Sequence, residues 1–205
     1  MELIKITEGQ TKLWVPDAEK YKLDSKMPVF FNPVMRLNRD ITVDVVKTLD
    51  KPKSLDLLSG TGAKGLRLAV EANSKVDLND ANPSAVKLIK RNAKLNKVSV
   101  EVFNDSANKL LRKSRRTYDF IDVDPFGTPV PFLQESIAHL RKGGILGVTA
   151  TDTSALCGTY PKACMRKYES LNRKTQMMFE LGTRILTKKV VAEGLNMGVA
   201  LEPVF

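Results

Sequence analysis

The chain has 205 residues, and 33 lysines and arginines against 23 aspartates and glutamates give it a formal net charge of +10 at pH 7. Its length suits one domain, and 42% hydrophobic with 27% charged residues is typical of a globular protein, which excludes a disordered or fibrous chain. No apolar run approaches the roughly 20 residues of a membrane span, and the first residues lack the order of a secretory signal, so we expect a cytoplasmic protein. The positive charge favours nucleic acid as a partner without establishing it.

Metal-binding side chains are scarce. Cys157 and Cys164 are the two cysteines, and His139 is the one histidine. These three residues cannot make a four-ligand zinc site, and two cysteines cannot make a disulfide framework. We therefore expect free thiols packed against apolar neighbours, and no metal site.

The first 37 residues differ from the rest of the chain. Two β-prone runs, 2–7 and 11–15, flank a glycine-containing turn and predict a hairpin. The segment FFNPVMRLNRD (30–40) follows and is broken by proline and asparagine. We expect residues 1–37 to form a hairpin and flap, and residues 38–205 to form the main domain.

The remainder alternates between short apolar runs and amphipathic stretches. A first helix is expected to begin at Asn38, with Ile41, Val45 and Leu49 on its buried face. The alternation after it predicts an α/β fold, a doubly wound and mostly parallel sheet covered by helices. The expected strands are 54–59, 75–80, 98–103, 118–123 and 143–152, and the expected helices are 63–72, 83–96, 107–116, 131–142 and 175–193.

A glycine-rich loop, SGTGAKG (59–65), lies directly after the first of these strands and opens a helix. It matches G-x-G-x-x-G, in which Gly60 and Gly62 let the backbone turn sharply and approach a ligand at a helix N-terminus. The loop predicts a nucleotide-like cofactor at this edge of the sheet. A nicotinamide dinucleotide and S-adenosylmethionine both fit the loop.

Two turns after the next strands carry further candidates. Either cofactor places a ribose near the end of the second strand, where a carboxylate accepts its hydroxyls. Asp80 is favoured over Asp77 because it ends the strand, whereas Asp77 lies inside it. The turn Asp105-Ser106-Ala107 after the third strand fits an adenine edge and fits equally a simple helix cap.

The fourth strand ends in Asp124-Pro125-Phe126-Gly127, which we interpret as a catalytic motif. An exocyclic amine on a base is a poor nucleophile because its lone pair is delocalised into the ring. Hydrogen bonds from the amine to a carboxylate and to a backbone carbonyl, whose direction proline fixes, hold the nitrogen closer to tetrahedral, and an aromatic ring stacks on the base. This motif favours S-adenosylmethionine, because a dehydrogenase has no need for it.

The strings IDVDPFGTPVPFL (121–133), LDLLSGTGAKGLRLAVE (55–71) and GGILGVTATDTSALCGTYPKACMRKY (143–168), with FFNPVMRLNRD and LND, resemble the tRNA (guanine-N2)-dimethyltransferases of archaea and eukaryotes. That family modifies the guanine at position 26 of tRNA. The resemblance covers nearly the whole chain, and the DPFG and LCGxxPxxCxRKY strings are its most specific parts.

The resemblance implies a Rossmann-like class I methyltransferase fold, with residues 38–205 as the S-adenosylmethionine-binding domain. It further implies S-adenosyl-L-methionine as methyl donor, one or two methyl transfers to the guanine amine, and tRNA as partner. By similarity Asp124 is the catalytic aspartate, and the motif argument adds Pro125 and Phe126 as the other catalytic residues. The cofactor contacts implied by the family and by the glycine loop are Arg39, Gly60, Gly62, Arg67, Asp80, Asp105, Ser106 and Ala107.

Basic residues near strand ends, or in the segment after DTSALCG, are candidate phosphate contacts for RNA. These candidates are Arg112, Lys113, Arg115, Arg116, Lys162, Arg166, Lys167, Arg173 and Lys174. The basic residues of the helix 83–96 and its end are interpreted instead as an ordinary solvated face; they are Lys87, Lys90, Arg91, Lys94 and Lys97.

The chain also departs from the family. Family members are longer and carry a C-terminal domain, and residues 169–173 and 179–182 differ from the family pattern. Class I sheets close with an antiparallel sixth and seventh strand, and MGVALEPVF supplies only a sixth. We therefore expect a strand at 197–204 whose outer side is covered by a second polypeptide or by an absent C-terminal domain. The alternative functions are a non-catalytic RNA-binding or assembly subunit that retains the fold, and an oxidoreductase that uses the same glycine loop.

Overall fold

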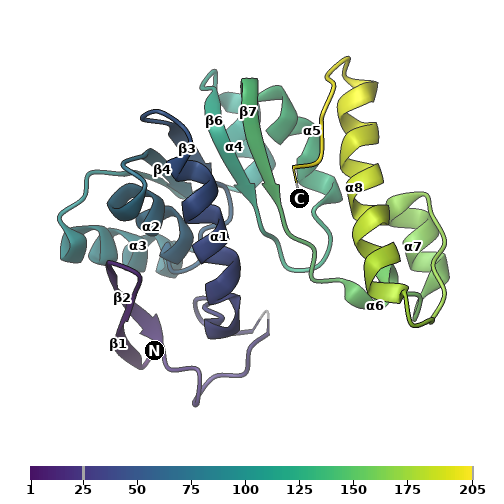
Figure 1. The fold of residues 1–205 in the computed structure, drawn as a ribbon. Helices are drawn as coiled ribbons and strands as arrows, with labels where there is room; N and C mark the ends of the chain where they lie inside the picture. The colour runs from purple at the N-terminus through teal and green to yellow at the C-terminus, as the bar shows by residue number, and fades with distance from the viewer. Residues whose placement is uncertain (25, 205) are drawn as a thin grey trace. The chain divides into compact units, whose positions relative to one another are not determined.

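A computed structural model describes residues 1–24 and 26–204 (Figure 1). Its contacts divide the chain into two compact units. The sheet unit comprises Met1–Asp122 and His139–Gly147, and the helical unit comprises Val123–Ala138 and Val148–Phe205. The expected division between residues 37 and 38, into a flap and a methyltransferase domain, stays a prediction.

Five strands form the larger sheet in the order β5-β4-β3-β6-β7. β3 pairs in parallel with both β4 and β6, and β4 pairs in parallel with β5. The order confirms the predicted doubly wound α/β fold. The strands are β3 (Lys53–Asp56), β4 (Lys75–Asn79), β5 (Glu101–Phe103), β6 (Tyr118–Val123) and β7 (Leu140–Val148).

The winding of the sheet reverses beside β3. The chain proceeds outward from β3 to β4 and β5, and then returns to β6 on the other side of β3. Ligands of open α/β sheets bind outside the carboxyl ends of the strands at such a switch point. The glycine loop follows β3, so the fold places it where a ligand is expected.

The α-helices of the sheet unit are α1 (Arg36–Lys47), α2 (Ala63–Glu71), α3 (Pro83–Asn96) and α4 (Ala107–Lys113). α3 has the predicted bounds because Asn82 caps it, accepting a hydrogen bond from the Ser84 N–H at 2.9 Å, and Pro83 occupies its first turn. The apolar side chains of α2, such as Leu66 and Leu68, are fully buried with Val76 and Leu78 of β4 in one core cluster. This burial holds the helices on the sheet.

The predicted N-terminal hairpin is confirmed. β1 (Leu3–Glu8) pairs antiparallel with β2 (Thr11–Pro16). Two asparagines of α3 bind its backbone: the Trp14 N–H donates to Asn92 Oδ1, and the Lys12 N–H donates to Asn96 Oδ1, both at 2.8 Å. Each side-chain amide also donates back to the carbonyl of the same hairpin residue, so α3 and β2 form one rigid surface.

The first helix begins earlier than predicted. Asn32 and Pro33 open a 3-10 turn, Pro33–Met35, which runs directly into α1, so Asn38 lies inside the helix and does not cap it. The predicted buried face is also wrong in part. Ile41 is 44% exposed, and the buried positions are Arg39, Val43 and Val46.

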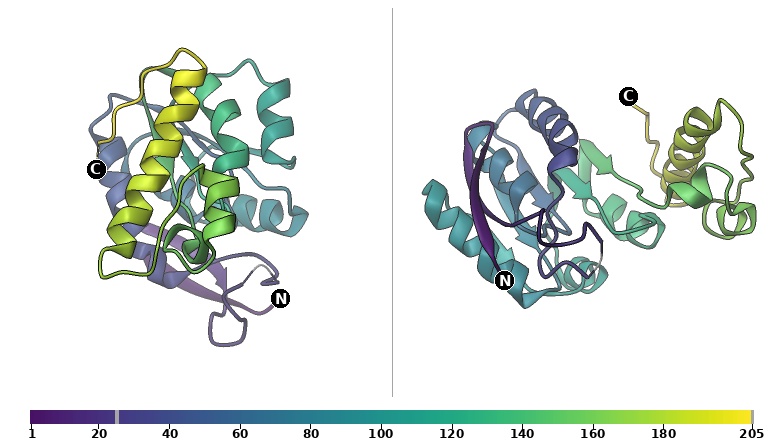
Figure 2. Two further views of the ribbon diagram at one scale, coloured as in Figure 1. Left: turned by 90° about the vertical axis from the view of Figure 1, so that its right-hand side faces the viewer. Right: turned by 90° about the horizontal axis from the view of Figure 1, so that it is seen from below.

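The helical unit is built from α5 (Val130–Ala138), α6 (Thr153–Leu156), α7 (Pro161–Tyr168) and α8 (Met178–Asn196). α8 contacts each of the other three helices, and Figure 2 shows it (yellow) beside the shorter α6 and α7 (green). Cys157 and Cys164 are free and buried in the apolar cluster between these helices, as predicted. Among the described residues, no helix is both long and apolar enough to cross a membrane.

The prediction of a strand at 197–204 is wrong, and with it the expected pairing of that strand with a second polypeptide loses its basis. Gly198, at a φ of +73°, ends α8, and the Val199 N–H donates back to the Gly194 carbonyl at 2.9 Å. Leu201 then packs closely on Gly194. A Cβ added to Gly194 would lie 2.8 Å from the Leu201 side chain. This local C-cap turns the segment back onto its own helix.

Candidate functional site

The glycine loop of the sheet unit adopts the conformation that its sequence predicts. Gly60 and Gly62 have φ angles of +53° and +77°, which residues with a side chain rarely adopt. A Cβ on Gly60 would lie 2.8 Å from the Phe30 carbonyl oxygen, because the flap segment crosses the loop there. The loop therefore requires glycine both for its turns and for the close approach of the flap.

Asp80 lies beside this loop at the end of β4. Its Oδ2 accepts a hydrogen bond from the Gly60 N–H, and its Oδ1 accepts one from the Asn82 N–H, both at 2.8 Å. Burial raises the pKa of Asp80, against the opposing effect of these two backbone bonds. A carboxylate has about four lone-pair sites, so each oxygen of this partly exposed group can accept one further bond.

Asn79 joins three strand ends next to Asp80, and the sequence reasoning missed it. It is fully buried, and its Nδ2 donates to the carbonyls of Leu57 and Asp105 at 3.0 Å each. Its Oδ1 accepts from the Asp105 N–H at 3.2 Å. The turns after β3 and β5 are thereby fixed to the end of β4, which holds the predicted cofactor residues Asp80 and Asp105 near each other.

The turn Asp105-Ser106-Ala107 begins α4. Asp105 Oδ1 accepts from the Ser106 N–H at 2.9 Å and lies 3.0 Å from the Lys109 ammonium. The hydrogen bond from Lys109 is the main reason that the pKa of Asp105 is lowered. These local contacts of Asp105 neither require nor prevent an adenine edge at this turn. The cofactor role of these three residues therefore stays a prediction.

A buried ion pair joins the glycine loop to β6. The Lys64 ammonium donates to both carboxylate oxygens of Asp122, at 2.8 and 2.9 Å, and both side chains are at least 90% buried. Asp56, at the end of β3, accepts from the Gly65 N–H at 2.9 Å. Each residue stands out in the sequence, because Lys64 lies within the glycine motif and Asp122 interrupts an apolar strand. The sequence does not show that these two residues, 58 positions apart, form a pair.

Arg39 and Arg67, the predicted cofactor arginines, are buried in a second network. Arg39 donates two hydrogen bonds to Glu8, at 2.6 and 2.7 Å, and Arg67 donates to Glu8, Asp40 and Glu71. Burial alone would raise the pKa of Glu8, but the bonds from the two arginines outweigh it and lower that pKa. These contacts favour a structural role, attaching the hairpin to α1 and α2, and the cofactor role of both arginines stays a prediction.

The DPFG motif lies in the helical unit, on the loop that leaves β6. Gly127 has a φ of +83°, and its N–H donates to Thr151 Oγ1 at 2.7 Å while its carbonyl accepts from the Thr151 N–H at 2.9 Å. Pro125 is buried, Asp124 is partly exposed, and the Phe126 ring is 53% exposed. The loop is therefore rigid, with its aromatic ring presented to solvent.

The LCGxxPxxCxRKY string builds the scaffold next to that loop. Asp152, before α6, accepts hydrogen bonds from the Tyr168 hydroxyl at 2.6 Å and from the Lys167 ammonium at 2.9 Å. Gly158 has a φ of +86°, and a Cβ on it would lie 2.6 Å from the Arg173 backbone. Asn172, inside the segment that departs from the family, is buried and donates to the Leu156 carbonyl at 2.5 Å.

The predicted RNA-binding residues fall into two groups. The Arg116 guanidinium is engaged by Asp77, at 2.9 Å, and by Glu101, and Lys167 by Asp152. The other group is exposed and consists of Arg112, Lys113, Arg115, Lys162, Arg166, Arg173 and Lys174, of which Lys113 also lies 3.8 Å from Asp105 Oδ2. Ion pairing favours a structural role for the first group, and RNA contact stays a prediction for all nine.

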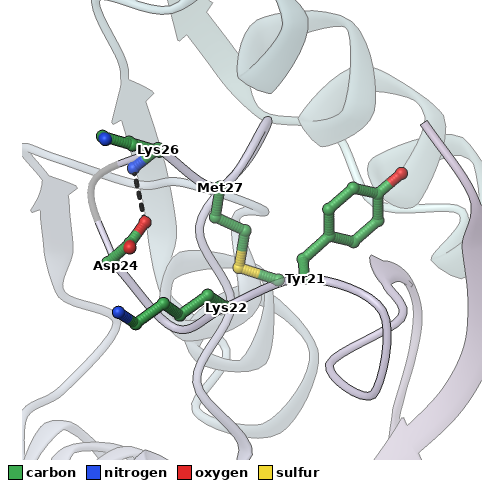
Figure 3. A pocket seen from close by; sticks show the side chains of 5 residues that line it. All are labelled: Tyr21, Lys22, Asp24, Lys26 and Met27. Atoms are coloured by element: carbon green, nitrogen blue, oxygen red, sulfur yellow. Dashed lines mark hydrogen bonds between the residues drawn. The ribbon is translucent and has the colours of Figure 1, made fainter.

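A pocket of about 340 Å³ lies in the segment between the hairpin and α1 (Figure 3). It is lined by Tyr21, Lys22, Asp24, Lys26 and Met27, and Asp24 Oδ1 accepts from the Lys26 N–H at 2.8 Å. None of the predicted site residues lines it. The candidate site is therefore defined by the sheet edge and not by this pocket.

The fold and the site together define a class of protein, a Rossmann-like α/β unit with a glycine loop and a partly exposed carboxylate at the carboxyl edge of its sheet. A family model described as N2,N2-dimethylguanosine tRNA methyltransferase matches residues 9–205. A tRNA (guanine(26)-N(2))-dimethyltransferase of Pyrobaculum islandicum is 43% identical over 208 residues, covering 100% of this chain and 59% of that protein. A tRNA (guanine(26)-N(2))-dimethyltransferase of Methanococcus maripaludis is 45% identical over 212 residues, covering 98% of this chain and 56% of that protein.

A solved structure agrees with these sequences. Trm1 from Pyrococcus horikoshii in complex with S-adenosyl-L-methionine is 38% identical, with a TM-score of 0.88 over 98% of this chain and 57% of that one. The chain belongs to the N2,N2-dimethylguanosine tRNA methyltransferase family, which confirms the resemblance seen in its motifs. It spans less than two thirds of the length of these relatives.

Proposed function

We propose that this chain carries the catalytic part of a tRNA methyltransferase, which transfers one or two methyl groups from S-adenosyl-L-methionine to the exocyclic amine of a guanine in tRNA. The observation that carries the proposal is the Asp80 carboxylate, oriented by one backbone N–H on each oxygen beside a glycine loop. Family membership supports the substrate, because the relatives are named for guanine 26 of tRNA. We place the protein in the cytoplasm, where its tRNA substrate would be found.

The residues of the sheet edge fit the adenosyl donor. The bare backbone of Gly60 and Gly62 allows close approach at the N-terminus of α2, and the free lone pairs of Asp80 accept the two ribose hydroxyls. When bound, S-adenosyl-L-methionine supplies a methyl group on a positively charged sulfur. A nicotinamide cofactor would leave the DPFG motif without a role.

Asp124 and Pro125 would orient the target amine. Asp124 accepts a hydrogen bond from the amine and the Pro125 carbonyl accepts a second, which keeps the nitrogen lone pair available for the methyl group. Asp124 follows the ion-paired Asp122 by two residues, so their Cα atoms are at most about 7 Å apart. The Lys64–Asp122 pair therefore fixes the strand end from which the catalytic loop starts.

Phe126 would hold the target base. A guanine inside a helix cannot reach a catalytic carboxylate, so base-modifying enzymes extrude the base and stack it on aromatic side chains. The Phe126 ring is 53% exposed on a loop held by Gly127 and Thr151, so it offers the base a stacking surface. Asp124, Pro125 and Phe126 thus share one rigid loop.

The experiment combines donor binding with methyl transfer. Calorimetry should show S-adenosyl-L-methionine binding to the chain, and a transcript of tRNA should gain one or two methyl groups on guanine 26 but none when that base is adenine. Asp124→Asn should retain donor binding and lower kcat by about 100-fold, because an amide offers the amine no negative charge. Donor binding without transfer by the parent chain would favour the non-catalytic subunit, and absence of donor binding would contradict the proposal altogether.

A further inference from the structure

The exposed face of α3 carries a stripe of positive charge that the proposed mechanism does not use. Lys87, Lys90 and Lys94, with Arg91 beside them, lie at the three- and four-residue spacings that place side chains on one helix face, and Lys97 follows directly as the C-cap of α3. All five are exposed. We call these residues the α3 basic face.

The α3 basic face has no acidic counterpart. α3 contains no aspartate or glutamate, and within residues 1–24 and 26–204 none of the five cations of the α3 basic face forms an ion pair. The exposed cations of α1 differ, because Arg36 lies 3.8 Å from Asp40 and Lys47 lies 3.0 Å from Asp44. Like charges at these spacings destabilise an isolated helix, so the sequence maintains a repulsive arrangement that a polyanion would relieve.

The face is held rigidly. Asn92 and Asn96 bind the hairpin backbone at Trp14 and Lys12 through paired amide hydrogen bonds. The Arg91 guanidinium lies 4.3 Å from the centroid of the Trp14 ring, and the exposed Lys12 adds a further cation from β2. A ligand would therefore meet charges whose backbone positions are fixed in advance, which lowers the entropy cost of binding.

We propose that the α3 basic face binds the phosphate backbone of RNA as a second contact surface for the tRNA substrate. The proposal rests on the proposed function only for the identity of the RNA. Helix geometry places the Cα atoms of Lys87 and Lys94 about 10 Å apart, a span over which several phosphates of an RNA strand can be reached. Lysines act as flexible point charges, so the contact fixes orientation without reading sequence.

A lipid surface fits the α3 basic face less well. Helices that lie on membranes expose large apolar side chains beside their cations. The apolar side chains of α3 are instead buried in the protein, as Leu88, Ile89 and Ala93 show. The face therefore offers charge alone, which is the chemistry of a phosphate backbone contact.

The test compares two triple variants that lose the same charge. Lys87→Gln/Lys90→Gln/Lys94→Gln removes three cations of the α3 basic face, and the control Lys20→Gln/Lys47→Gln/Arg184→Gln removes three exposed cations that are paired with acids. Binding of a tRNA transcript is measured over a series of salt concentrations. Each lost phosphate contact should reduce the slope of log K against log salt by about 0.7–0.9, so we expect a fall of about 2–3 in the first variant and little change in the control.

Three outcomes separate the possibilities. Equal slopes in the two variants would overturn the proposal, even if the parent chain methylates tRNA. A lower slope in the α3 variant alone would support it, even if the parent chain fails to methylate, so failure of the proposed function is distinguishable. Loss of binding to vesicles of anionic lipid, with tRNA binding unchanged, would assign the face to a membrane and overturn the RNA proposal. Thermal unfolding and donor calorimetry verify that both variants keep their fold and donor site.

Discussion

Asp77, inside β4, and Asp80, directly after that strand, use their carboxylates in different ways. At the carboxyl ends of the strands, Asp80 is partly exposed, and among the described residues its carboxylate is bound only by backbone N–H groups, one on each oxygen. Inside β4, Asp77 is 1% exposed and accepts hydrogen bonds from the Tyr118 hydroxyl and the Arg116 guanidinium, both at 2.9 Å. Side chains satisfy Asp77 from within the protein, whereas Asp80 is oriented and keeps acceptor capacity for a ligand.

The neighbours of Asp77 show that this position is structural. Burial is the main reason that the pKa of the Tyr118 phenol is raised, and the charge of Asp77 raises it further. The Lys53 ammonium lies 3.7 Å from Asp77 and 4.9 Å from the centroid of the Tyr118 ring. The comparison teaches that charge alone does not identify a binding residue; what matters is whether its hydrogen-bonding capacity is already used.

The largest expected effect comes from breaking the buried ion pair at the carboxyl end. Lys64→Met should lower the free energy of unfolding by about 3–5 kcal/mol, because it leaves Asp122 buried without its ammonium partner. The double variant Lys64→Met/Asp122→Leu should recover much of that loss, since it removes both charges of the pair. Urea unfolding measures both, and an unaltered midpoint in the single variant would show that water or another group compensates Asp122.

Asp80 and Asp77 should separate binding from stability. Asp80→Ala should weaken S-adenosyl-L-methionine binding by about 1.5–3 kcal/mol, the usual value of hydrogen bonds to a charged group, with a smaller change in unfolding. Asp77→Ala should do the reverse, lowering the free energy of unfolding by a similar amount while donor affinity is kept. Calorimetry and urea unfolding on both variants check this, and donor binding that depends on Asp77 would reverse the assignment.

Much of this contrast could be predicted from the sequence, because it depends on local position. The end of the strand and the following Asn82-Pro83 cap pointed to Asp80, and the same cap set the bounds of α3. The glycine conformations followed from the motif. The boundary before β7 was predicted wrongly. Residues 140–142 were expected to end the helix 131–142, but they form the first part of β7 (Leu140–Val148).

What the sequence could not predict depends on contacts between distant residues. Lys64 and Asp122 are 58 positions apart, and Arg39 of α1 is 31 positions from Glu8 of the hairpin. Only the folded chain brings the members of each pair together. The strand predicted at 197–204 failed for a local reason that was overlooked, since Gly198 and Leu201 form a helix cap. An apolar run indicates burial, but it does not indicate which partner buries it.

A smaller effect should appear at acid pH. Because the folded pKa of Glu8 is lowered, its contribution to stability is present above its unfolded pKa, near 4.5, and is lost as the pH falls through its folded value. The free energy of unfolding of the parent should therefore fall with acid below about pH 4.5. Glu8→Gln should show a shallower fall when unfolding is measured in urea from pH 7 to pH 3, and parallel curves would remove Glu8 as a cause.

The smallest effect distinguishes two neighbouring arginines. Arg115 is exposed, whereas Arg116 is bound by Asp77 and Glu101. Arg115→Gln should flatten the salt dependence of tRNA binding by about 0.7–0.9 if it contacts one phosphate, and Arg116→Gln should change it less. Equal slopes for the two variants would show that ion pairing does not withhold Arg116 from RNA.

The central claim, that Asp80 accepts the ribose hydroxyls of the donor, is tested most directly by a cycle between protein and ligand. S-adenosyl-L-homocysteine and its 2′-deoxy analogue are titrated by calorimetry into the parent chain and into Asp80→Ala. We predict that removing the 2′-hydroxyl weakens binding to the parent by about 10-fold, equivalent to about 1.4 kcal/mol, and has little effect on Asp80→Ala, because the acceptor is already gone. The same loss in both proteins would contradict the account and place the ribose elsewhere.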